Sequence, residues 1–430
     1  AANSGINPAP NDRFITQRNA VDINHSLEIN SDTKLNTLLY WSKLDRDYWR
    51  QSILDRNQDA TVFKSCNAGA DCQAGRNREF QMLGLDSRLT HGYKALGISN
   101  EMELGVRLHT ESQSNQVVTS QTLAHSGRLT LHEENKANSV ALYAQNRFLI
   151  TPDFAIIPGV RVESYNQNRS NVMTNKSGSA KNIETVPQIG ATWRLIPEAQ
   201  IYSSIYKGFA PAQLATAIDD KGVDQQLAPE RSTNMEIGLR GRSGGFSYDS
   251  AIFSMDFSNQ IVNQSLASGI SKANGGQSLH QGAELSLGYE IGSGWSINTN
   301  VTYIPVARFV GTNSLGKDGK RIPYTPELTS NFGVNYQKNG FNTLLSLNYV
   351  SNQYADSANT VAQNAIGTIG EVPAFATVNW SVNYDINKEW KVFGVVNNLF
   401  DKRYIASRSP DGIFPGAPLN FQAGMSYQFN

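Results

Sequence analysis

Arginine, glutamine and aromatic residues recur in the polar stretches of this 430-residue chain. A guanidinium group grips a carboxylate through two parallel hydrogen bonds, while amides and aromatic rings add further directed or flat contacts. Together these residue types suit the binding of an anionic ligand. Our candidate contacts, chosen because they fall near predicted strand ends or in loops, are Arg46, Trp49, Arg50, Tyr206, Gln213, Gln264, Arg308 and Arg408.

Catalytic chemistry has no comparable support in the sequence. We find no glycine-rich phosphate loop leading into a helix, no His-Glu-x-x-His pair and no serine in a nucleophile turn. His109, His125 and His132 fall in or beside one long polar stretch, which leaves open a metal-binding loop or ordinary surface histidines. We therefore expect neither an enzyme nor an intrinsic cofactor or metal centre.

The two cysteines, Cys66 and Cys72, lie close together in a polar stretch. This arrangement favours a disulfide across a small surface loop, and hence an oxidising compartment, over two free thiols. A zinc site would need further ligands, and no neighbouring histidine or second cysteine pair supplies them. We expect a disulfide between Cys66 and Cys72.

Composition and charge argue against a nucleic-acid-binding protein and against a helical membrane protein. Lys and Arg number 37, and Asp and Glu also number 37, so no overall field favours nucleic acid as a partner. The mean hydropathy is −0.40, and no apolar run approaches the roughly 20 residues of a membrane helix. A membrane strand needs only about 10 alternating residues, so a transmembrane β-barrel fits this composition.

Alternation of apolar and polar residues predicts the β-strands that must position the candidate residues. The last stretch of the chain alternates strictly, with one face made of Phe421, Ala423, Met425, Tyr427 and Phe429. Such a stretch predicts a strand with one face suited to lipid and one suited to water. Similar segments recur along the chain and give about 17 strands.

The connections between these strands alternate in length. Short turns rich in Gly, Asn, Asp or Pro are predicted at 30–33, 151–153, 197–198, 242–245, 292–294, 338–340 and 387–389. Long polar connections are predicted at 52–80, 110–136, 165–184, 210–231, 259–277, 308–325, 355–372 and 401–418. Long extracellular loops alternating with short periplasmic turns are typical of an outer-membrane antiparallel β-barrel.

Aromatic residues at strand ends are expected to form the two interfacial girdles of such a barrel, and we assign to them Tyr40, Trp41, Trp193, Tyr202, Tyr303, Tyr349, Trp390 and Tyr427. An odd count of 17 strands conflicts with the even number usual in bacterial single-chain barrels. We therefore expect the first strands of the barrel to precede this chain.

Several longer segments carry a family resemblance. They are Leu142–Phe148, Ile157–Glu163, Tyr206–Pro211, Leu227–Gly238, His280–Leu285, Asn398–Tyr404, Pro415–Pro418 and the final strand. These segments resemble the TonB-dependent outer-membrane receptors. A narrower likeness to the ferric dicitrate branch rests on Asp356–Thr360, Ile369–Phe375 and Asn263–Gln264.

The resemblance implies a 22-stranded barrel preceded by a plug domain with a TonB box. Residues 1–430 would then be the C-terminal barrel portion, without the plug and about five strands. The implied function is import of a ferric siderophore or ferric citrate across the bacterial outer membrane, energised through TonB.

Basic residues in the loops suit the anionic chelate and, equally well, the phosphates of lipopolysaccharide in the outer-membrane lipid. Two alternatives to the ferric receptor stay open. One is a passive diffusion porin, and the other is a receptor for another metallophore carrying zinc, haem or cobalamin.

Overall fold

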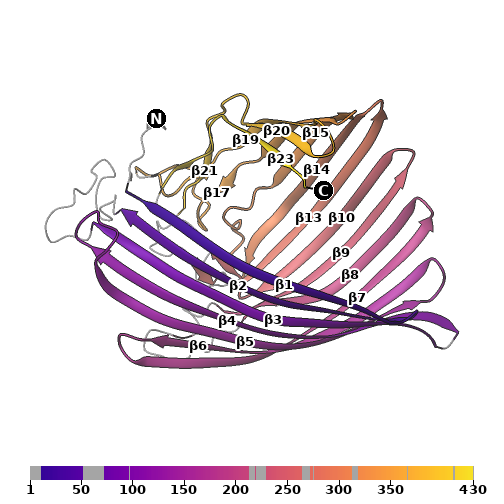
Figure 1. The fold of residues 1–430 in the computed structure, drawn as a ribbon, viewed down its shortest axis with the longest axis horizontal. Helices are drawn as coiled ribbons and strands as arrows, with labels where there is room; N and C mark the ends of the chain where they lie inside the picture. Colours follow the sequence, from indigo (N-terminus) through magenta and orange to yellow (C-terminus); the bar gives the residue numbers. More distant parts are fainter. Residues whose placement is uncertain are drawn as a thin grey trace. The chain divides into compact units, whose positions relative to one another are not determined.

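The computed structural model describes residues 11–51, 72–95, 97–212, 218, 229–263, 272–274, 276–311, 318–365, 367–409 and 412–429. Seventeen strands belong to one sheet, and three pairs of short strands lie in the connections (Figure 1). Within the described part of the chain, no helix is long and apolar enough to cross a membrane. The predicted all-β fold and strand number are confirmed.

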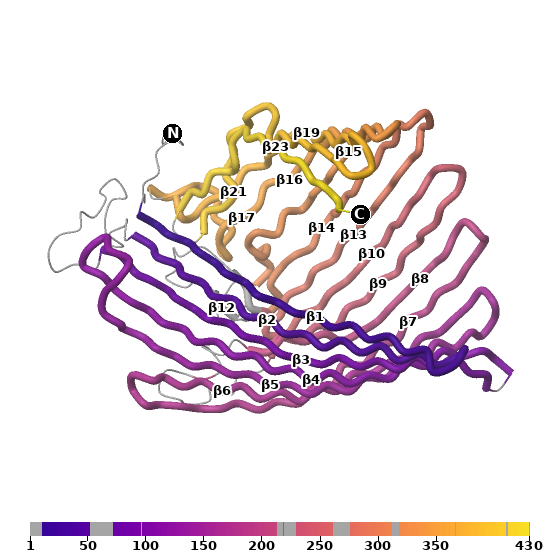
Figure 2. Tube along the Cα trace, in the orientation of Figure 1, coloured from indigo at the N-terminus to yellow at the C-terminus, as the bar shows by residue number. Residues whose placement is uncertain are grey.

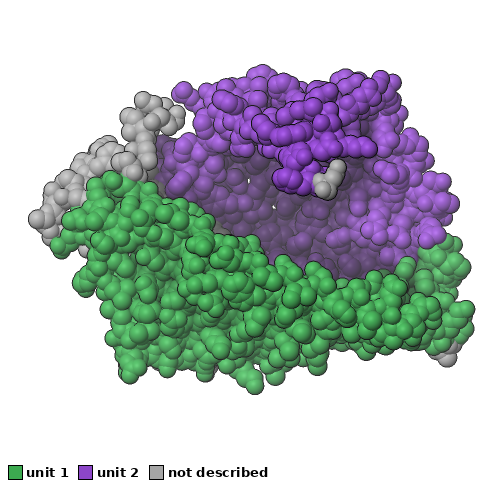
Figure 3. All heavy atoms as spheres, viewed as in Figure 1, with its two compact units in different colours: residues 1–189, 209–229 green, residues 190–208, 230–430 purple. Residues whose placement is uncertain are grey.

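The chain divides into two compact units, which Figure 3 colours separately. Unit 1 comprises residues 1–189 and 209–229, and unit 2 comprises residues 190–208 and 230–430. In both units each strand runs antiparallel to its neighbour in every pairing described below.

Unit 1 is built from long hairpins. Its strands are β1 (Arg13–Asn30), β2 (Thr33–Gln51), β3 (Gln73–Ala95), β4 (Ile98–Ser120), β5 (Arg128–Leu149), β6 (Phe154–Asn171) and most of β7 (Lys176–Ile196). Each strand from β1 to β5 pairs with the next one in the chain. β3 and β4 each contain 23 residues, about twice what a membrane strand needs.

Unit 2 has shorter strands, and some of its connections contain short strand pairs of their own (Figure 2). Its sheet strands are β8 (Ala199–Ala210, to residue 208), β9 (Glu230–Ser243), β10 (Phe246–Ser258), β13 (Gln277–Gly292), β14 (Trp295–Val310), β15 (Leu328–Lys338), β16 (Phe341–Val350), β19 (Phe375–Asp385), β20 (Trp390–Asn397) and β23 (Asn420–Tyr427). The short pairs are β11 (Ile261–Asn263) with β12 (Lys272–Asn274), β17 (Gln353–Tyr354) with β18 (Glu371–Val372), and β21 (Ile405–Ser407) with β22 (Phe414–Pro415).

The two faces of the sheet in unit 1 differ in polarity. The cross-strand register aligns Leu35, Leu89 and Leu104 in one row across β2 to β4. Because alternate residues of a strand share a face, this face is completed by an apolar belt of Leu39, Trp41, Leu83, Leu85, Val106, Leu108, Val140, Leu142, Val160 and Val162. We call this side the apolar face and the opposite side the polar face.

Unit 2 shows the same division. The register aligns Phe332, Leu347 and Val378 on the apolar face, and the belt continues to Phe421 on β23. The polar face carries asparagine pairs between strands, such as Asn331 Nδ2 donating to Asn348 Oδ1 at 2.7 Å. The alternation predicted for the final strand is therefore confirmed over Asn420–Tyr427.

The predicted short turns agree with the structure. Hairpin turns occupy residues 31–32, 150–153, 197–198, 244–245, 293–294, 339–340 and 386–389. One further turn, between Ala95 and Ile98, was not predicted. Left-handed glycines at several of these turns explain the choice of residue, for example Gly340 with a φ of 79°.

Three predicted long connections are wrong in their bounds. β3 begins at Gln73, residues 121–127 alone separate β4 from β5, and residues 172–175 alone separate β6 from β7. The predicted connections 52–80, 110–136 and 165–184 therefore contain long stretches of strand. These stretches are polar on both faces, so they lack the alternation that identifies a strand in a sequence.

Two predicted girdle residues, Tyr40 and Tyr202, lie on the polar face instead. The ring of Tyr40 covers Gly84, its partner across β2 and β3, where a Cβ would lie 2.2 Å from the Tyr40 hydroxyl. Tyr202 donates a hydrogen bond to Asp249 Oδ1 at 3.0 Å. A tyrosine hydroxyl forms a hydrogen bond where a polar group is within reach, and the polar face supplies one.

Candidate ligand-binding site

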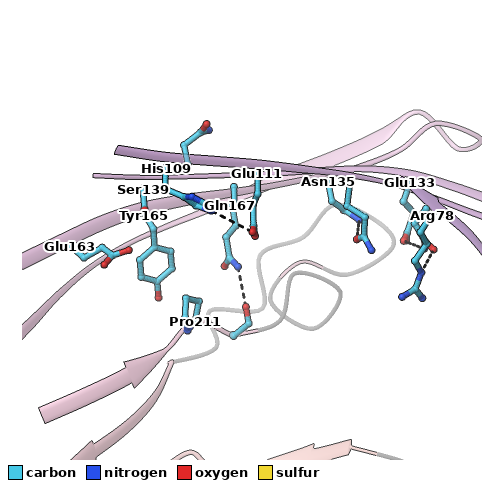
Figure 4. Close-up of a pocket in the computed structure, with 15 residues that line it drawn as sticks. Arg78, His109, Glu111, Glu133, Asn135, Ser139, Glu163, Tyr165, Gln167 and Pro211 are labelled. Atoms are coloured by element: carbon cyan, nitrogen blue, oxygen red, sulfur yellow. Dashed lines mark hydrogen bonds and ion pairs between the residues drawn. The ribbon is translucent and has the colours of Figure 1, made fainter. Parts of the chain in front are cut away.

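The polar face of unit 1 is hollowed toward the ends of β3 to β6 that carry the long β2–β3 connection. The cavity has a volume of about 570 Å³ and is bordered by Pro211 and Ala212, which follow β8 (Figure 4). The strand residues that line it are Arg78, His109, Glu111, Gln113, Asn115, Glu133, Asn135, Ala137, Asn138, Ser139, Glu163, Tyr165 and Gln167.

A chain of polar contacts crosses four strands beside the cavity. Arg78 Nε donates to Asn115 Oδ1 at 2.8 Å, and Asn115 Nδ2 donates to Glu133 Oε2 at 3.0 Å. Arg169 Nε donates to Glu133 Oε1 at 3.0 Å. Because Asn115, Glu133 and Arg169 are all buried, these contacts form in a low-dielectric setting where they are strong.

The segment after β8 is attached to this wall through two main-chain oxygens. Gln167 Nε2 donates to the carbonyl oxygen of Ala212 at 3.1 Å, and the Arg169 guanidinium donates to that of Ile218. The rings of Tyr165 and Phe209 stack, with centroids 5.9 Å apart. The described part of this segment is thus fixed against β6.

His109 links the cavity to the interior-facing residues nearer the short turns. Its Nδ1 lies 2.7 Å from the hydroxyl of Tyr40, which also accepts a hydrogen bond from Arg107 Nη2 at 3.1 Å. Its Nε2 lies 3.7 Å from Glu111 Oε2. The imidazole is therefore held between a hydroxyl and a carboxylate.

Charges in and around the cavity are close to balanced. The lining contains three carboxylates, Glu111, Glu133 and Glu163, of which Glu133 contacts Arg169 and Glu163 contacts Arg161 Nε at 3.0 Å. Most of the other polar lining groups are amides and hydroxyls, which both donate and accept. The arrangement suits hydrogen bonding to a polar ligand rather than the capture of a bare anion.

Among the residues that the structure describes, no group of three or more His, Cys, Asp or Glu side chains is placed to hold a metal ion.

The chain matches one family model, described as "TonB dependent receptor-like, beta-barrel", over residues 2–399. The chain belongs to this family of TonB-dependent receptors. The family consists of transport receptors of the bacterial outer membrane, and its barrel fold is the fold of this chain. In such a barrel the apolar face contacts lipid and the polar face lines the interior.

Similar proteins include two receptors and one transporter. The catecholate siderophore receptor Fiu of Escherichia coli K12 is 22% identical over 452 residues, covering 92% of this chain and 57% of Fiu. The pesticin receptor of Yersinia pestis is 24% identical over 279 residues, covering 62% of this chain and 40% of that receptor. The solved structure of the unliganded ferric citrate transporter FecA matches with a TM-score of 0.81 and 21% identity, covering 97% of this chain and 62% of FecA. The chain thus spans less than two thirds of each of these proteins.

Three residues predicted to contact a ligand lie on β2 of the receptor, but on different faces. Arg46 is paired with Arg78 across β2 and β3, so it lies on the polar face beside the cavity, and Arg50 shares that face by alternation. Trp49 lies on the opposite face with Trp41. It is 2% exposed and covers Gly75.

Arg308 is also turned away from the polar face. The pairing of β13 with β14 shifts between Gln281 and Ala283, where Ile304 and Pro305 provide one extra residue on β14. Such a bulge tolerates proline and changes which residues share a face. As a result Arg308 pairs with Leu279 and is exposed on the side of the apolar belt. Tyr206, in contrast, shares the polar face of β8 with Tyr202 by alternation.

Arg408 is used inside the loops of unit 2. It is 3% exposed, and its guanidinium donates to the carbonyl oxygens of Gly367 at 3.1 Å and Glu371 at 3.0 Å. Its main-chain N donates to the Tyr324 hydroxyl at 3.2 Å. Burial lowers the pKa of the Arg408 guanidinium from its usual value. Arg408 thus joins three connections through its side chain and its main-chain N.

Gln213, Gln264 and Cys66 lie outside the described residues, so their predicted roles stay predictions. Cys72 is described: it is buried, and its Sγ lies 3.0 Å from the carbonyl oxygen of Gln121. The Cys66–Cys72 disulfide therefore also stays a prediction.

Sequence reasoning missed most of the cavity lining, including Arg78, Asn115, Glu133 and Gln167. These residues lie in the strand extensions that were predicted to be loops. One sequence signal was available, since the β-branched run Val117-Val118-Thr119 favours a strand within the stretch 110–136.

Proposed function

We propose that this chain is the C-terminal barrel portion of a receptor that imports a ferric chelate, energised through TonB. The cavity on the polar face of β3 to β6 is the observation that carries the proposal. It opens on the barrel interior at the end of the strands that bears long connections, where an extracellular ligand arrives. Its volume of about 570 Å³ is within the usual range for small-ligand sites.

The polar groups of the cavity support a particular class of chelate. Asn135 is 8% exposed, and its Oδ1 has no hydrogen-bond partner among the described residues. Arg78 and Glu111 add one basic and one acidic group to the lining. A chelate that presents hydroxyl and carbonyl oxygens fits this set, and the carboxylate or catecholate oxygens of an anionic ferric complex can accept hydrogen bonds from Arg78.

Transport then follows from the two faces of the sheet. The loops capture the chelate, the cavity holds it, and the polar face provides a hydrated path along the barrel interior. A plug domain in the preceding part of the protein, coupled to TonB, would control that path. No chemical conversion of the ligand is required, so we propose a transporter rather than an enzyme.

The test is equilibrium binding to the full-length receptor, with ferric citrate, a ferric catecholate and a zinc metallophore as probes. Arg78→Gln and Asn135→Ala should weaken binding of the preferred chelate by about tenfold or more, because each removes a hydrogen-bonding group from the lining of the cavity. Arg147→Gln, near the short-turn end of β5, is the matched control. Equal affinity of all four proteins for every chelate would contradict the proposed site.

A passive porin is separated from this proposal by conductance. Planar-bilayer recording of the full-length protein should show a closed pore, since a plugged receptor does not conduct. Steady open-channel current would favour the porin.

A further inference from the structure

A second cavity lies on the apolar-face side of unit 1, beyond the end of the belt. Its volume is about 440 Å³, and its lining includes Arg13, Asp47, Trp49 and Asn77. The register pairs Arg13 with Trp49, and alternation along β2 puts Asp47 and Trp49 on the same face as Trp41. The cavity therefore faces outward, on the opposite side of the sheet from the proposed chelate site.

Its walls hold an unusual concentration of unpaired polar atoms. Arg13 Nε and Trp49 Nε1 are buried donors, and Asp47 Oδ1 and Asn77 Oδ1 are buried acceptors, with no hydrogen-bond partner among the described residues. Leaving such a group unsatisfied costs about 1–3 kcal/mol, so a folded protein rarely collects four of them around one space. The indole of Trp49 is 2% exposed and is fixed over Gly75, so its donor is held in place.

The charge of the cavity disfavours an ion as its occupant. On this face its lining contains the guanidinium group of Arg13 and three carboxylates, of Asp45, Asp47 and Glu79. The Arg13 guanidinium forms an ion pair with Asp47, and Lys43 contacts Asp45 at 3.5 Å and Glu79 at 2.9 Å. A phosphate would meet the carboxylates, and a cation would meet carboxylates that already have a basic partner.

We propose that this outward cavity binds an uncharged sugar unit. A sugar ring carries several hydroxyls, and each of them both donates and accepts hydrogen bonds. Such a ring can therefore pair with the two unpaired donors and the two unpaired acceptors of the cavity. The position of the cavity indicates the source. It lies past Trp41 and Leu83, where the belt ends and the sheet leaves the lipid layer on the side of the long connections.

The inference rests on the outer-membrane receptor proposed above, because the outer leaflet at this height carries the saccharide part of lipopolysaccharide, whose contact with the loops was expected from the sequence. The inference gives that contact a specific site. A sugar of the lipid-linked oligosaccharide would bind at β1 to β4, whereas the sequence had suggested that phosphates bind to basic residues of the loops. The residues that carry it, Arg13, Asp47, Trp49 and Asn77, do not line the chelate cavity.

The experiment compares three probes on the full-length receptor in detergent: lipopolysaccharide with a complete core, deep-rough lipopolysaccharide that lacks most core sugars, and free core oligosaccharide. Complete-core lipopolysaccharide should bind more tightly than the deep-rough form. Trp49→Phe keeps the ring over Gly75 but removes the donor, and Asn77→Ala removes an acceptor. Each should weaken binding of the complete-core form by about fivefold to tenfold.

Trp295→Phe, on the apolar face of unit 2, is the control and should bind like the unsubstituted protein. Free oligosaccharide that binds with the same dependence on Trp49 would show that the sugar alone suffices, and binding of the lipid-linked form only would show that the anchor is needed. Equal affinity for complete-core and deep-rough lipopolysaccharide would overturn the proposal. So would an affinity difference between the two forms that is unchanged in both Trp49→Phe and Asn77→Ala, since the cavity would then hold water. Ferric chelate uptake should be unchanged in Trp49→Phe, so a failure here is distinct from a failure of the receptor function.

Discussion

Arg169 and Glu133 form a buried ion pair between β6 and β5 on the polar face of unit 1. Arg169 Nε lies 3.0 Å from Glu133 Oε1, and the two residues are 9% and 4% exposed. The same guanidinium reaches the carbonyl oxygen of Ile218. One pair of residues thus joins two strands of the wall to the segment that follows β8.

Glu133→Gln should lower the free energy of unfolding by about 3 kcal/mol, because it takes a carboxylate charge away from a buried guanidinium. Chemical denaturation in detergent micelles measures the change. Glu134→Gln is the matched control, since Glu134 has a side chain 51% exposed and contacts His132 on the other face. An exposed pair contributes about 1 kcal/mol at most. Equal losses in the two variants would argue against a buried role for Glu133.

Gly105→Ala should displace Tyr143. A Cβ at Gly105 would lie 2.0 Å from the Tyr143 ring, which is directly opposite it across β4 and β5. Moving the ring also costs the hydrogen bond from Tyr143 to Asp86 Oδ1 at 3.1 Å, so we expect a loss of about 1–3 kcal/mol.

The control for this change is Gly92→Ala, whose Cβ would meet nothing closer than 3.8 Å. Thermal unfolding followed by the gel mobility of folded barrel compares the two. A loss in Gly92→Ala as large as that in Gly105→Ala would show that the ring contact is not the cause.

Leu347→Lys tests which face of β16 meets lipid. Leu347 lies in the apolar belt and is 42% exposed, so a lysine there should cost about 2–4 kcal/mol near the middle of the bilayer. Ser346→Lys, the adjacent residue on the polar face, should be tolerated. Folding yield into vesicles and denaturant midpoint give the comparison, and the reverse order would overturn the assignment of the faces.

Arg408→Lys should loosen the loops of unit 2. An ammonium group cannot reproduce the planar set of contacts to Gly367, Glu371 and Gln363, so the connections that Arg408 joins should open more often. Limited proteolysis of the intact receptor should become several times faster. Arg403→Lys, at an exposed arginine in the same connection, should change nothing.

Much of the fold could be predicted from the sequence. Alternation along Phe421, Met425 and Tyr427 and along the other belt strands identifies the lipid-facing side, because a strand in a bilayer must be apolar on that side. The short turns were found because Gly, Asn, Asp and Pro supply backbone angles that other residues avoid. Both signals are local, so they need no knowledge of contacts.

The candidate site was much less predictable. Arg78, Asn115 and Glu133 lie on strand extensions above the belt, where both faces meet water and alternation disappears. Their extended conformation depends on pairing with residues far away in the chain, as Arg78 and Asn115 show by being opposite each other across β3 and β4. No local pattern encodes that pairing.

The sequence by itself determined that this chain forms amphipathic strands with a lipid-facing and an interior side. Only the tertiary structure decided which polar residues belong to which side. Arg46 and Trp49 separate onto opposite faces of β2, and the bulge at Pro305 turns Arg308 outward. The Arg408 guanidinium donates its hydrogen bonds to main-chain carbonyl oxygens of a distant connection, so it does not face a ligand. The physical reason is that hydropathy determines which residues share a face only where one side of the strand contacts lipid. Beyond the belt, cross-strand register and packing determine on which face each residue lies.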